Sequence, residues 1–175
     1  VIELPKDILI PEAVGEYHMD TQVTMRSYNP TIKGHVKQIR KAVKTISEAQ
    51  RIVVYSGGGI VLSDTSALLT TLVEKLNAPC TNTLMGLGGL SGTHKNFIGM
   101  LGMHGSLEAN KAMANADVIL ALGARFDDRV TNNVKKFCPD ATIVHVDIDP
   151  TSISKTINAH IPVVGLVENV IQQLL

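Results

Sequence analysis

The sequence contains no tryptophan, three phenylalanines, three tyrosines and two cysteines among its 175 residues. So few aromatic side chains leave Val, Ile, Leu and Ala to build the core, which is typical of α/β proteins with strands buried on both faces. Cys80 and Cys138 lie far apart, and the sequence has neither a CxxC pair nor histidines at zinc-ligand spacing. These absences argue against a disulfide framework and a metal site, and favour a reduced, cytoplasmic setting.

Two further absences limit the function classes. Lysine plus arginine equals aspartate plus glutamate, 16 against 16, so no overall field attracts nucleic acid or an anionic membrane. No apolar run approaches the roughly 20 residues that span a bilayer, and no signal peptide opens the sequence. We therefore expect neither a nucleic-acid nor a membrane partner. Because the first residue is Val rather than Met, we also expect a piece of a longer protein.

The prolines and the periodicity of apolar residues divide the chain in two. Residues 1–30 contain three prolines and few periodic apolar positions, which predicts a linker. Residues 31–175 predict one α/β domain. Within the linker, Lys6 directly follows Pro5 and is a candidate for a fixed positive charge, with an exposed, solvated lysine as the alternative. Apolar residues recur every three or four positions over 31–50, which predicts a surface helix with one basic face.

Short apolar runs without polar alternation predict parallel strands that are covered on both faces. They lie at 51–56, 79–83, 117–122, 142–146 and 161–164. Helical segments are expected at about 63–77, 107–116 and 167–175. This alternation predicts a doubly wound, mostly parallel sheet of five or six strands with helices on both faces, a Rossmann-like α/β fold.

The stretch from Gly99 to Val130 reads as a glycine-flexed loop, a short helix, a buried strand and a second glycine turn. Glycines let the backbone approach a flat ligand closely. Ser106 is a candidate N-cap, and the first turn of the helix after it favours an anion. Four charged residues then follow the buried strand, namely Arg125, Asp127, Asp128 and Arg129. Ligands bind at this carboxyl end of the strands in open α/β sheets.

A second glycine turn follows the strand at 51–56, where Gly57, Gly58 and Gly59 precede a helical segment. Strand, glycine turn and helix form the outline of a phosphate-binding unit. The full GxGxxG spacing fails, because position 62 is leucine, and close packing of the turn explains the three glycines about as well.

The strand at 142–146 ends in an acidic segment, Asp147 to Pro150. An acidic residue at this place can accept a hydrogen bond from a ribose hydroxyl. Capping of the following turn by Asp149 or Thr151 is an equally weighted alternative.

Six phrases resemble the acetolactate synthase family, also called acetohydroxyacid synthase, over nearly the whole chain. They are LPKD, MRSYNPT, TLMGLG, GMLGMHG, NADVILALGARFDDRVT and VHVDIDPTSISK. The resemblance implies the central domain of a three-domain catalytic subunit that depends on thiamine diphosphate and magnesium. That family condenses two 2-oxoacids, pyruvate with pyruvate or with 2-oxobutyrate, in the biosynthesis of valine, isoleucine and leucine.

The resemblance implies that the domain binds FAD, although the reaction has no net redox step. Backbone N–H groups and Arg125 would meet the pyrophosphate, and Met and Leu side chains would cover the ring system. The implied flavin-binding positions are Gly57, Gly58, Gly59, Thr83, Leu84, Met85, His104, Gly105, Gly123, Arg125, Val130, Asp147 and Ile148.

The resemblance also places three residues at the substrate site of the parent enzyme. Arg129 would receive the carboxylate of the second 2-oxoacid, since a guanidinium fork suits a planar carboxylate. Met103 and Lys6 would line the substrate channel. From the sequence alone, an ion pair of Arg129 with Asp127 or Asp128 stays open as the alternative.

Several family features are missing. The glutamate that activates thiamine and the metal-binding GDG segment belong to the first and third domains, so we expect no catalytic residue and no activity in this chain alone. Leu166 follows Gly165 where the family usually has aspartate, and an upstream flavin-contacting arginine is absent. Expected partners are the other domains, a second catalytic subunit and a small regulatory subunit. The competing interpretations are an NAD-binding domain of another enzyme class and a purely structural packing domain.

Overall fold

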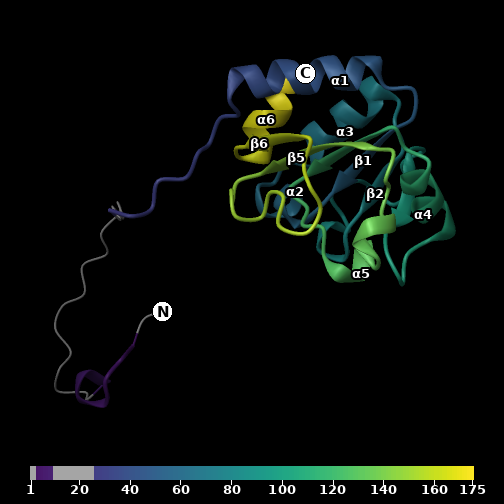
Figure 1. Ribbon diagram of the computed structural model, residues 1–175. Coiled ribbons are helices and arrows are strands. Elements are labelled where there is room, and N and C mark those ends of the chain that lie inside the picture. Colours follow the sequence, from purple (N-terminus) through teal and green to yellow (C-terminus); the bar gives the residue numbers. More distant parts are fainter. Residues whose placement is uncertain (1–2, 10–25) are drawn as a thin grey trace.

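The computed structural model describes residues 3–9 and 26–175, and its body is built on one six-stranded parallel sheet (Figure 1). The strands are β1 (Ile52–Ser56), β2 (Cys80–Asn82), β3 (Phe97–Met100), β4 (Val118–Leu122), β5 (Thr142–Asp147) and β6 (Ile161–Val164). Their order is β3-β2-β1-β4-β5-β6, and every neighbouring pair is parallel. This is the Rossmann order, in which the direction of winding reverses between β1 and β4.

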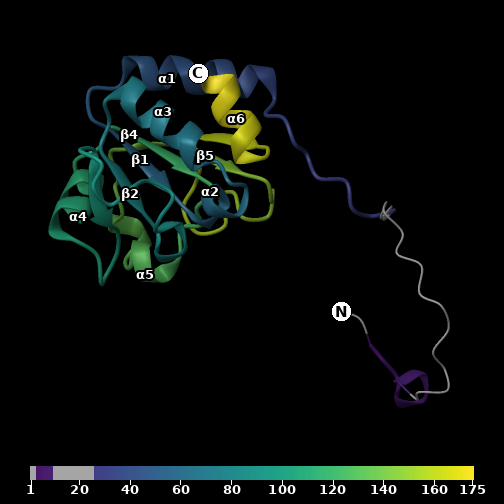
Figure 2. The same cartoon turned by 180° about the vertical axis from the view of Figure 1, so that it is seen from behind.

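One face of the sheet is covered by three helices, which Figures 1 and 2 show together on the same side. They are α1 (Val36–Glu48), α3 (Ser66–Leu76) and α6 (Val167–Leu174). Their buried residues, such as Leu69 and Val170, share a core with Val54 of β1 and Leu120 of β4. Both faces of these strands are buried, and for this reason their sequences are continuous aliphatic runs.

The other face is covered by α4 (Leu107–Ala114) and by the irregular segment that follows β4. That segment contains α5 (Asp128–Thr131) and a short 3-10 helix, η4 (Val134–Lys136). Met113 of α4 and Phe126 of the segment pack with Tyr55 and Ile119 of the sheet. Helices therefore lie on both faces, and the predicted doubly wound α/β class is confirmed.

Two local predictions are wrong. The stretch that reads as a glycine-flexed loop contains β3, where Gly99 has a φ of 89° and its carbonyl oxygen accepts a hydrogen bond from the Thr81 hydroxyl over 2.9 Å. The helix expected over about 63–77 is observed as α3, which begins at Ser66, and an additional short helix, α2 (Gly58–Leu62), forms inside the glycine turn before it. The helix expected over 31–50 is also shorter, because Gly34 is buried and the His35 ring caps α1.

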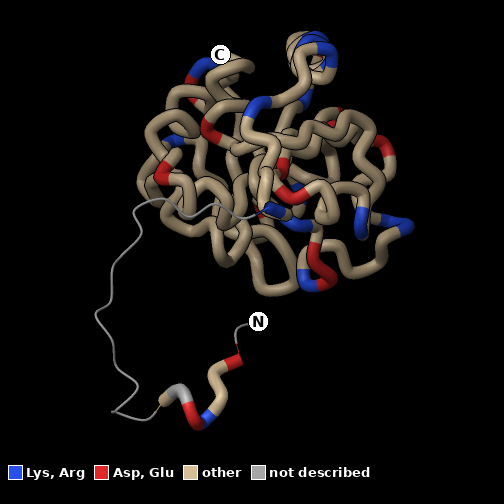
Figure 3. Tube along the Cα trace, turned by 90° about the vertical axis from the view of Figure 1, so that its left-hand side faces the viewer, with Lys and Arg blue, Asp and Glu red and all other residues tan. Residues whose placement is uncertain are grey.

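The remaining described segments are short. The 3-10 helix η1 (Lys6–Leu9) stands apart from the α/β body in Figure 1, and η3 (Leu84–Gly86) follows β2. No helix in the described part of the chain is both long and apolar enough to cross a membrane. Basic residues are concentrated on α1, whereas both signs are mixed over the rest of the body (Figure 3).

Candidate functional site

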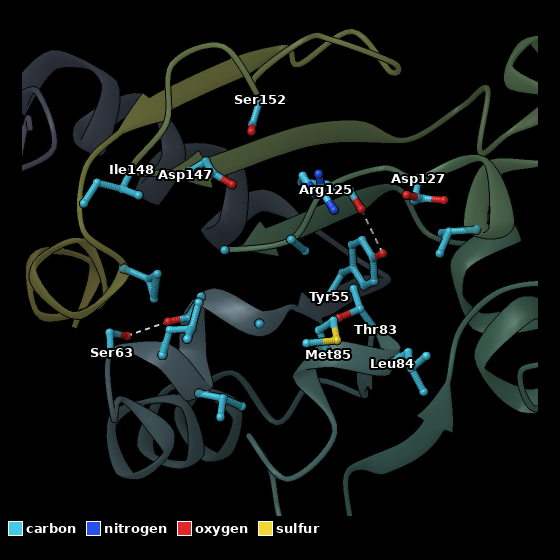
Figure 4. Close-up of a pocket in the computed structure, with 18 of the residues that line it drawn as sticks. Tyr55, Ser63, Thr83, Leu84, Met85, Arg125, Asp127, Asp147, Ile148 and Ser152 are labelled. Carbon is cyan, nitrogen blue, oxygen red and sulfur yellow. Dashed lines mark hydrogen bonds between the residues drawn. The ribbon is translucent and has the colours of Figure 1, made fainter. Parts of the chain in front are cut away.

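A cavity of about 980 Å³ opens at the carboxyl ends of β1 and β4, where the order of the strands reverses (Figure 4). This position is where open α/β sheets bind their ligands. Loops from five parts of the chain form its walls. The lining residues are Tyr55, Gly58, Gly59, Val61, Leu62, Ser63, Thr83, Leu84, Met85, Gly123, Ala124, Arg125, Asp127, Arg129, Val130, Asp147, Ile148, Ser152, Leu166, Val167 and Glu168.

The two glycine turns meet at the floor of this cavity. The Gly59 N–H donates to the Gly123 carbonyl oxygen over 3.0 Å. A Cβ on Gly57 would lie 2.2 Å from that same oxygen, and a Cβ on Gly59 would lie 2.8 Å from the Cα of Gly123. Gly57 and Gly59 are therefore needed for packing of the turns, while Gly58 lines the cavity and has Met85 as the nearest neighbour of an added Cβ, at 3.2 Å.

Two arginines line the cavity, and within the described residues neither pairs with a carboxylate. Asp127 caps α5 by accepting a hydrogen bond from the backbone N–H of Arg129 over 3.2 Å. A hydrogen bond with Asp128, that backbone bond and the charges of Arg125 and Arg129 hold the pKa of Asp127 below its usual range. The ion pair proposed as the alternative for Arg129 is thus replaced by helix capping, and both guanidinium groups are available to an anion.

Apolar side chains project into the solvent at the rim of the cavity. Leu62 is 90% exposed, Met85 75% and Leu84 70%. Figure 4 shows Leu84 and Met85 side by side on the segment that follows β2. Large exposed apolar groups gathered at one concave site indicate a ligand with apolar surface rather than an unpartnered patch.

In the acidic segment after β5, one carboxylate caps the turn and another lines the cavity. Asp149 accepts hydrogen bonds from the Thr151 N–H over 2.9 Å and the Thr151 hydroxyl over 2.8 Å. These bonds lower its pKa. Asp147 accepts from the Asp149 N–H over 2.9 Å and lines the cavity beside Ile148. Asp149 therefore shapes the turn, and Asp147 is the carboxylate that a ligand can reach.

The structure brings together most, but not all, of the residues implied by the sequence. Ten implied flavin positions line the cavity, an eleventh, Gly57, lies in the turn at its floor, and Arg129 lines the cavity too. The lining residues do not include Met103, His104, Gly105 or Lys6. Met103 nevertheless lies beside the site, because its N–H donates to the Arg129 carbonyl oxygen over 2.9 Å. The exposed Lys6 is on η1.

Sequence reasoning missed three parts of the wall. The sequence predicts Tyr55 only as a strand residue, yet it lines the cavity and its hydroxyl donates to the Arg125 carbonyl oxygen over 3.3 Å. Burial raises its pKa, so it stays a neutral donor. Ser152 and the start of α6, including Glu168, were also missed. A lone tyrosine at the end of an aliphatic strand, followed by a glycine turn, is the one signal that could have revealed Tyr55.

Comparisons with known proteins agree on one family. Residues 39–174 match the model described as thiamine pyrophosphate enzyme, central domain. The whole chain is 55% identical to the acetolactate synthase large subunit of Buchnera aphidicola subsp. Acyrthosiphon pisum, of which it covers 31%. It is 53% identical to the acetolactate synthase isozyme 3 large subunit of Escherichia coli (strain K12) and covers 30% of it. A probable acetolactate synthase large subunit of Methanococcus aeolicus is 42% identical over 99% of the chain, which covers 30% of that protein. The chain thus spans less than a third of the length of these relatives.

Proposed function

The chain belongs to the thiamine pyrophosphate enzymes, in which it forms the central domain, and we propose that it is the FAD-binding domain of an acetolactate synthase. In this proposal the parent enzyme condenses pyruvate with pyruvate or with 2-oxobutyrate. The domain holds the flavin and contributes one arginine to the site of the second 2-oxoacid. The observation that carries the proposal is the large cavity where the order of the strands reverses.

The size and the lining of the cavity support FAD as the ligand. Its volume of about 980 Å³ is at the upper end of the roughly 300–1,000 Å³ of ligand pockets, as a long dinucleotide needs. Leu84 and Met85 offer apolar surface to a flat ring system, and the Arg125 guanidinium suits a diphosphate. A Cβ on Gly58 would stand 3.2 Å from the Cβ of Met85, so the missing side chain keeps this wall open.

The other end of the cavity suits the adenosine part. Asp147 and Ile148 line it after β5, and a carboxylate there accepts hydrogen bonds from ribose hydroxyls. Leu166 stands at the same wall, where the family usually has aspartate, so that contact is either missing or made by backbone groups. When bound, the flavin is a structural group, since the condensation of two 2-oxoacids has no net redox step.

Arg129 is proposed to receive the carboxylate of the second 2-oxoacid. It lines the cavity as the second residue of α5, and its own backbone is fixed by Asp127 and by the Met103 N–H. A fixed backbone aims the guanidinium, and a planar carboxylate can then accept two parallel hydrogen bonds. Met103, 54% exposed beside it, would contact the apolar part of the substrate, and Lys6 would join the same channel in the parent enzyme.

The rest of the machinery is assigned to other parts of the parent protein. Thiamine diphosphate and magnesium would be bound by the other domains of the subunit, and the active site would be completed by a second catalytic subunit. The relatives are named large subunits, which favours a small regulatory subunit as a further partner. The chain by itself is therefore proposed to bind cofactor without catalysis.

A flavin titration tests the proposal. FAD added to the purified chain should shift the flavin absorbance spectrum, and bound flavin should survive dialysis. Arg125→Gln should weaken binding about 10- to 100-fold, because a charge-assisted hydrogen bond contributes about 1.5–3 kcal/mol. Arg40→Gln, on the exposed face of α1, is the matched control that also removes one positive charge, and it should leave the affinity for FAD unchanged. Preference for NAD over FAD, or binding of neither, would reject the proposal.

A further inference from the structure

Tyr55 and His145 lie in one row across three neighbouring strands of the sheet. Tyr55 of β1 is in register with Ala121 of β4, which is in register with His145 of β5. Residues in such a row point to the same face of a sheet. Both rings are buried, with Tyr55 0% and His145 1% exposed, and Ala121 is the residue between them in the row.

The polar atoms of these two rings bind adjacent carbonyl groups of the turn that follows β4. His145 Nε2 lies 2.9 Å from the Ala124 carbonyl oxygen, and the Tyr55 hydroxyl lies 3.3 Å from that of Arg125 (Figure 4 shows the second bond). A carbonyl oxygen only accepts, so the ring proton of His145 must be on Nε2.

The next residue of the turn packs against the same two rings. The Phe126 ring centroid lies 5.5 Å from that of Tyr55 and 5.2 Å from that of His145, with an interplanar angle of 87° in the second pair. Edge-to-face contacts of this kind contribute about 0.5–1.5 kcal/mol beyond area burial. The side chains of Tyr55 and His145 thus contact three consecutive residues of the turn, Ala124 to Phe126.

A histidine at position 145 lowers the stability of the folded chain. Its Nδ1 atom is buried and has no hydrogen-bond partner, and an orphaned polar atom costs about 1–3 kcal/mol. An aliphatic residue at position 145 would avoid that cost while filling the core. What the histidine adds is the Nε2 bond to the turn. Burial lowers the pKa of His145, so the ring is neutral at pH 7 and this donor is uncharged.

We infer that Tyr55 and His145 are positioning residues that hold the Ala124–Phe126 turn so that Arg125 is set in the cavity wall before a ligand arrives. The inference rests on the proposed function for the identity of the anion, a diphosphate, that Arg125 meets. A turn that is already ordered loses less conformational entropy on binding, so the ligand binds more tightly. Loss of either ring contact should therefore weaken binding without removing any group that touches the ligand's phosphates.

The test measures two quantities separately in the full chain, the order of the Ala124–Phe126 turn and the affinity for FAD. The ¹⁵N order parameter of the Arg125 amide should be near the rigid value of about 0.85 in the unchanged chain and fall toward about 0.6 in Tyr55→Phe and in His145→Leu. Both variants should bind FAD about tenfold more weakly. His145→Gln keeps an N–H donor of similar reach and should restore both values. Val144→Ala, on the opposite face of β5, lowers stability and should change neither the order parameter nor the affinity for FAD.

Each outcome has a defined meaning. Unchanged order parameters in Tyr55→Phe and His145→Leu would show that the pair does not hold the turn. A loosened turn with unchanged FAD affinity would overturn the link to binding. If the unchanged chain bound no FAD, the proposed function would fail, while the order parameters would still decide whether the two rings order the turn. Tyr55→Phe removes one oxygen atom and decides the matter by itself if His145→Leu does not fold.

Discussion

Gly59 and Gly123 touch through their backbones, and neither has room for a side chain. A Cβ on either residue would lie 2.8 Å from the Cα of the other, and Gly123 also has a φ of 56°. Gly59→Ala and Gly123→Ala should therefore each lower the free energy of unfolding by about 1–3 kcal/mol through overpacking. Gly123→Ala should cost more, because positive φ adds strain. Urea denaturation of the purified variants measures this.

Gly58→Ala is the matched control for that prediction. Its Cβ would come no closer than 3.2 Å, to the Cβ of Met85, with the carbonyl oxygen of that residue at 3.5 Å, so a displacement of exposed Met85 by a few tenths of an ångström relieves the contact. The change in the free energy of unfolding should stay below about 0.5 kcal/mol. Equal losses in Gly58→Ala and Gly59→Ala would contradict the close approach of the two turns.

The apolar rim of the cavity should matter for the ligand and not for the fold. Met85 is 75% exposed, so Met85→Ala should change the free energy of unfolding by less than about 0.5 kcal/mol. It should weaken FAD binding about three- to tenfold, because about 1 kcal/mol of apolar contact with the ring system is lost. Leu107→Ala truncates another exposed apolar residue, 64% exposed and outside the cavity. A similar loss of affinity in that variant would mean that the effect is not local.

The sequence pattern predicts the strands of the sheet correctly where burial alone determines the structure. The run from Val118 to Leu122 is buried on both faces, and no polar residue interrupts it. Ser106 was expected to cap a helix, and its hydroxyl oxygen accepts from the Ala109 N–H over 3.1 Å. These features depend on a few neighbouring residues, so local patterns predict them.

Features that depend on distant pairing were not predictable in this way. Gly99 belongs to a strand only because β3 pairs with β2, about twenty residues earlier. The glycine-rich α2 has little intrinsic tendency to form a helix, and it forms where its turn is packed on Gly123. Likewise, the row that joins Tyr55 to His145 depends on the register of three strands. The part of the site that these two rings build was missed for that reason.

As the pH falls from 7 to 5, the free energy of unfolding should decrease more steeply in this chain than in a variant without His145. Burial holds the pKa of His145 below its ordinary value of about 6.5. Between that value and the lower native pKa, the unfolded chain takes up a proton that the native chain does not, so the free energy of unfolding decreases as pH falls. The slope is at most about 1.4 kcal/mol per pH unit. Urea denaturation from pH 7 to 5 should show this slope reduced in His145→Gln. Parallel curves would contradict the prediction.

Asp147 should distinguish the adenosine part of the flavin from its ring part. It lines the cavity after β5, where the proposal places the adenosine part of FAD, whereas FMN lacks the adenosine. Asp147→Ala should weaken FAD binding about tenfold, the effect of one lost hydrogen bond to a charged group, and leave FMN binding unchanged. Titrations of both flavins, followed by fluorescence, measure the two affinities. Equal losses for FMN and FAD would place Asp147 away from the adenosine.

Arg129 should act on the second substrate and not on the first. In the parent enzyme, Arg129→Lys keeps the positive charge but loses the planar fork that a carboxylate binds with two bonds. Condensation with the second 2-oxoacid should slow about 10- to 100-fold, an effect of about 1.4–2.7 kcal/mol, while decarboxylation of the first pyruvate should change little. Assays of product formation and of carbon dioxide release separate the two steps. The backbone N–H of Arg129 also donates to the capping Asp127, so thermal unfolding of the variant is the control. If both steps slowed equally and the unfolding temperature fell, Arg129 would have a role in folding instead.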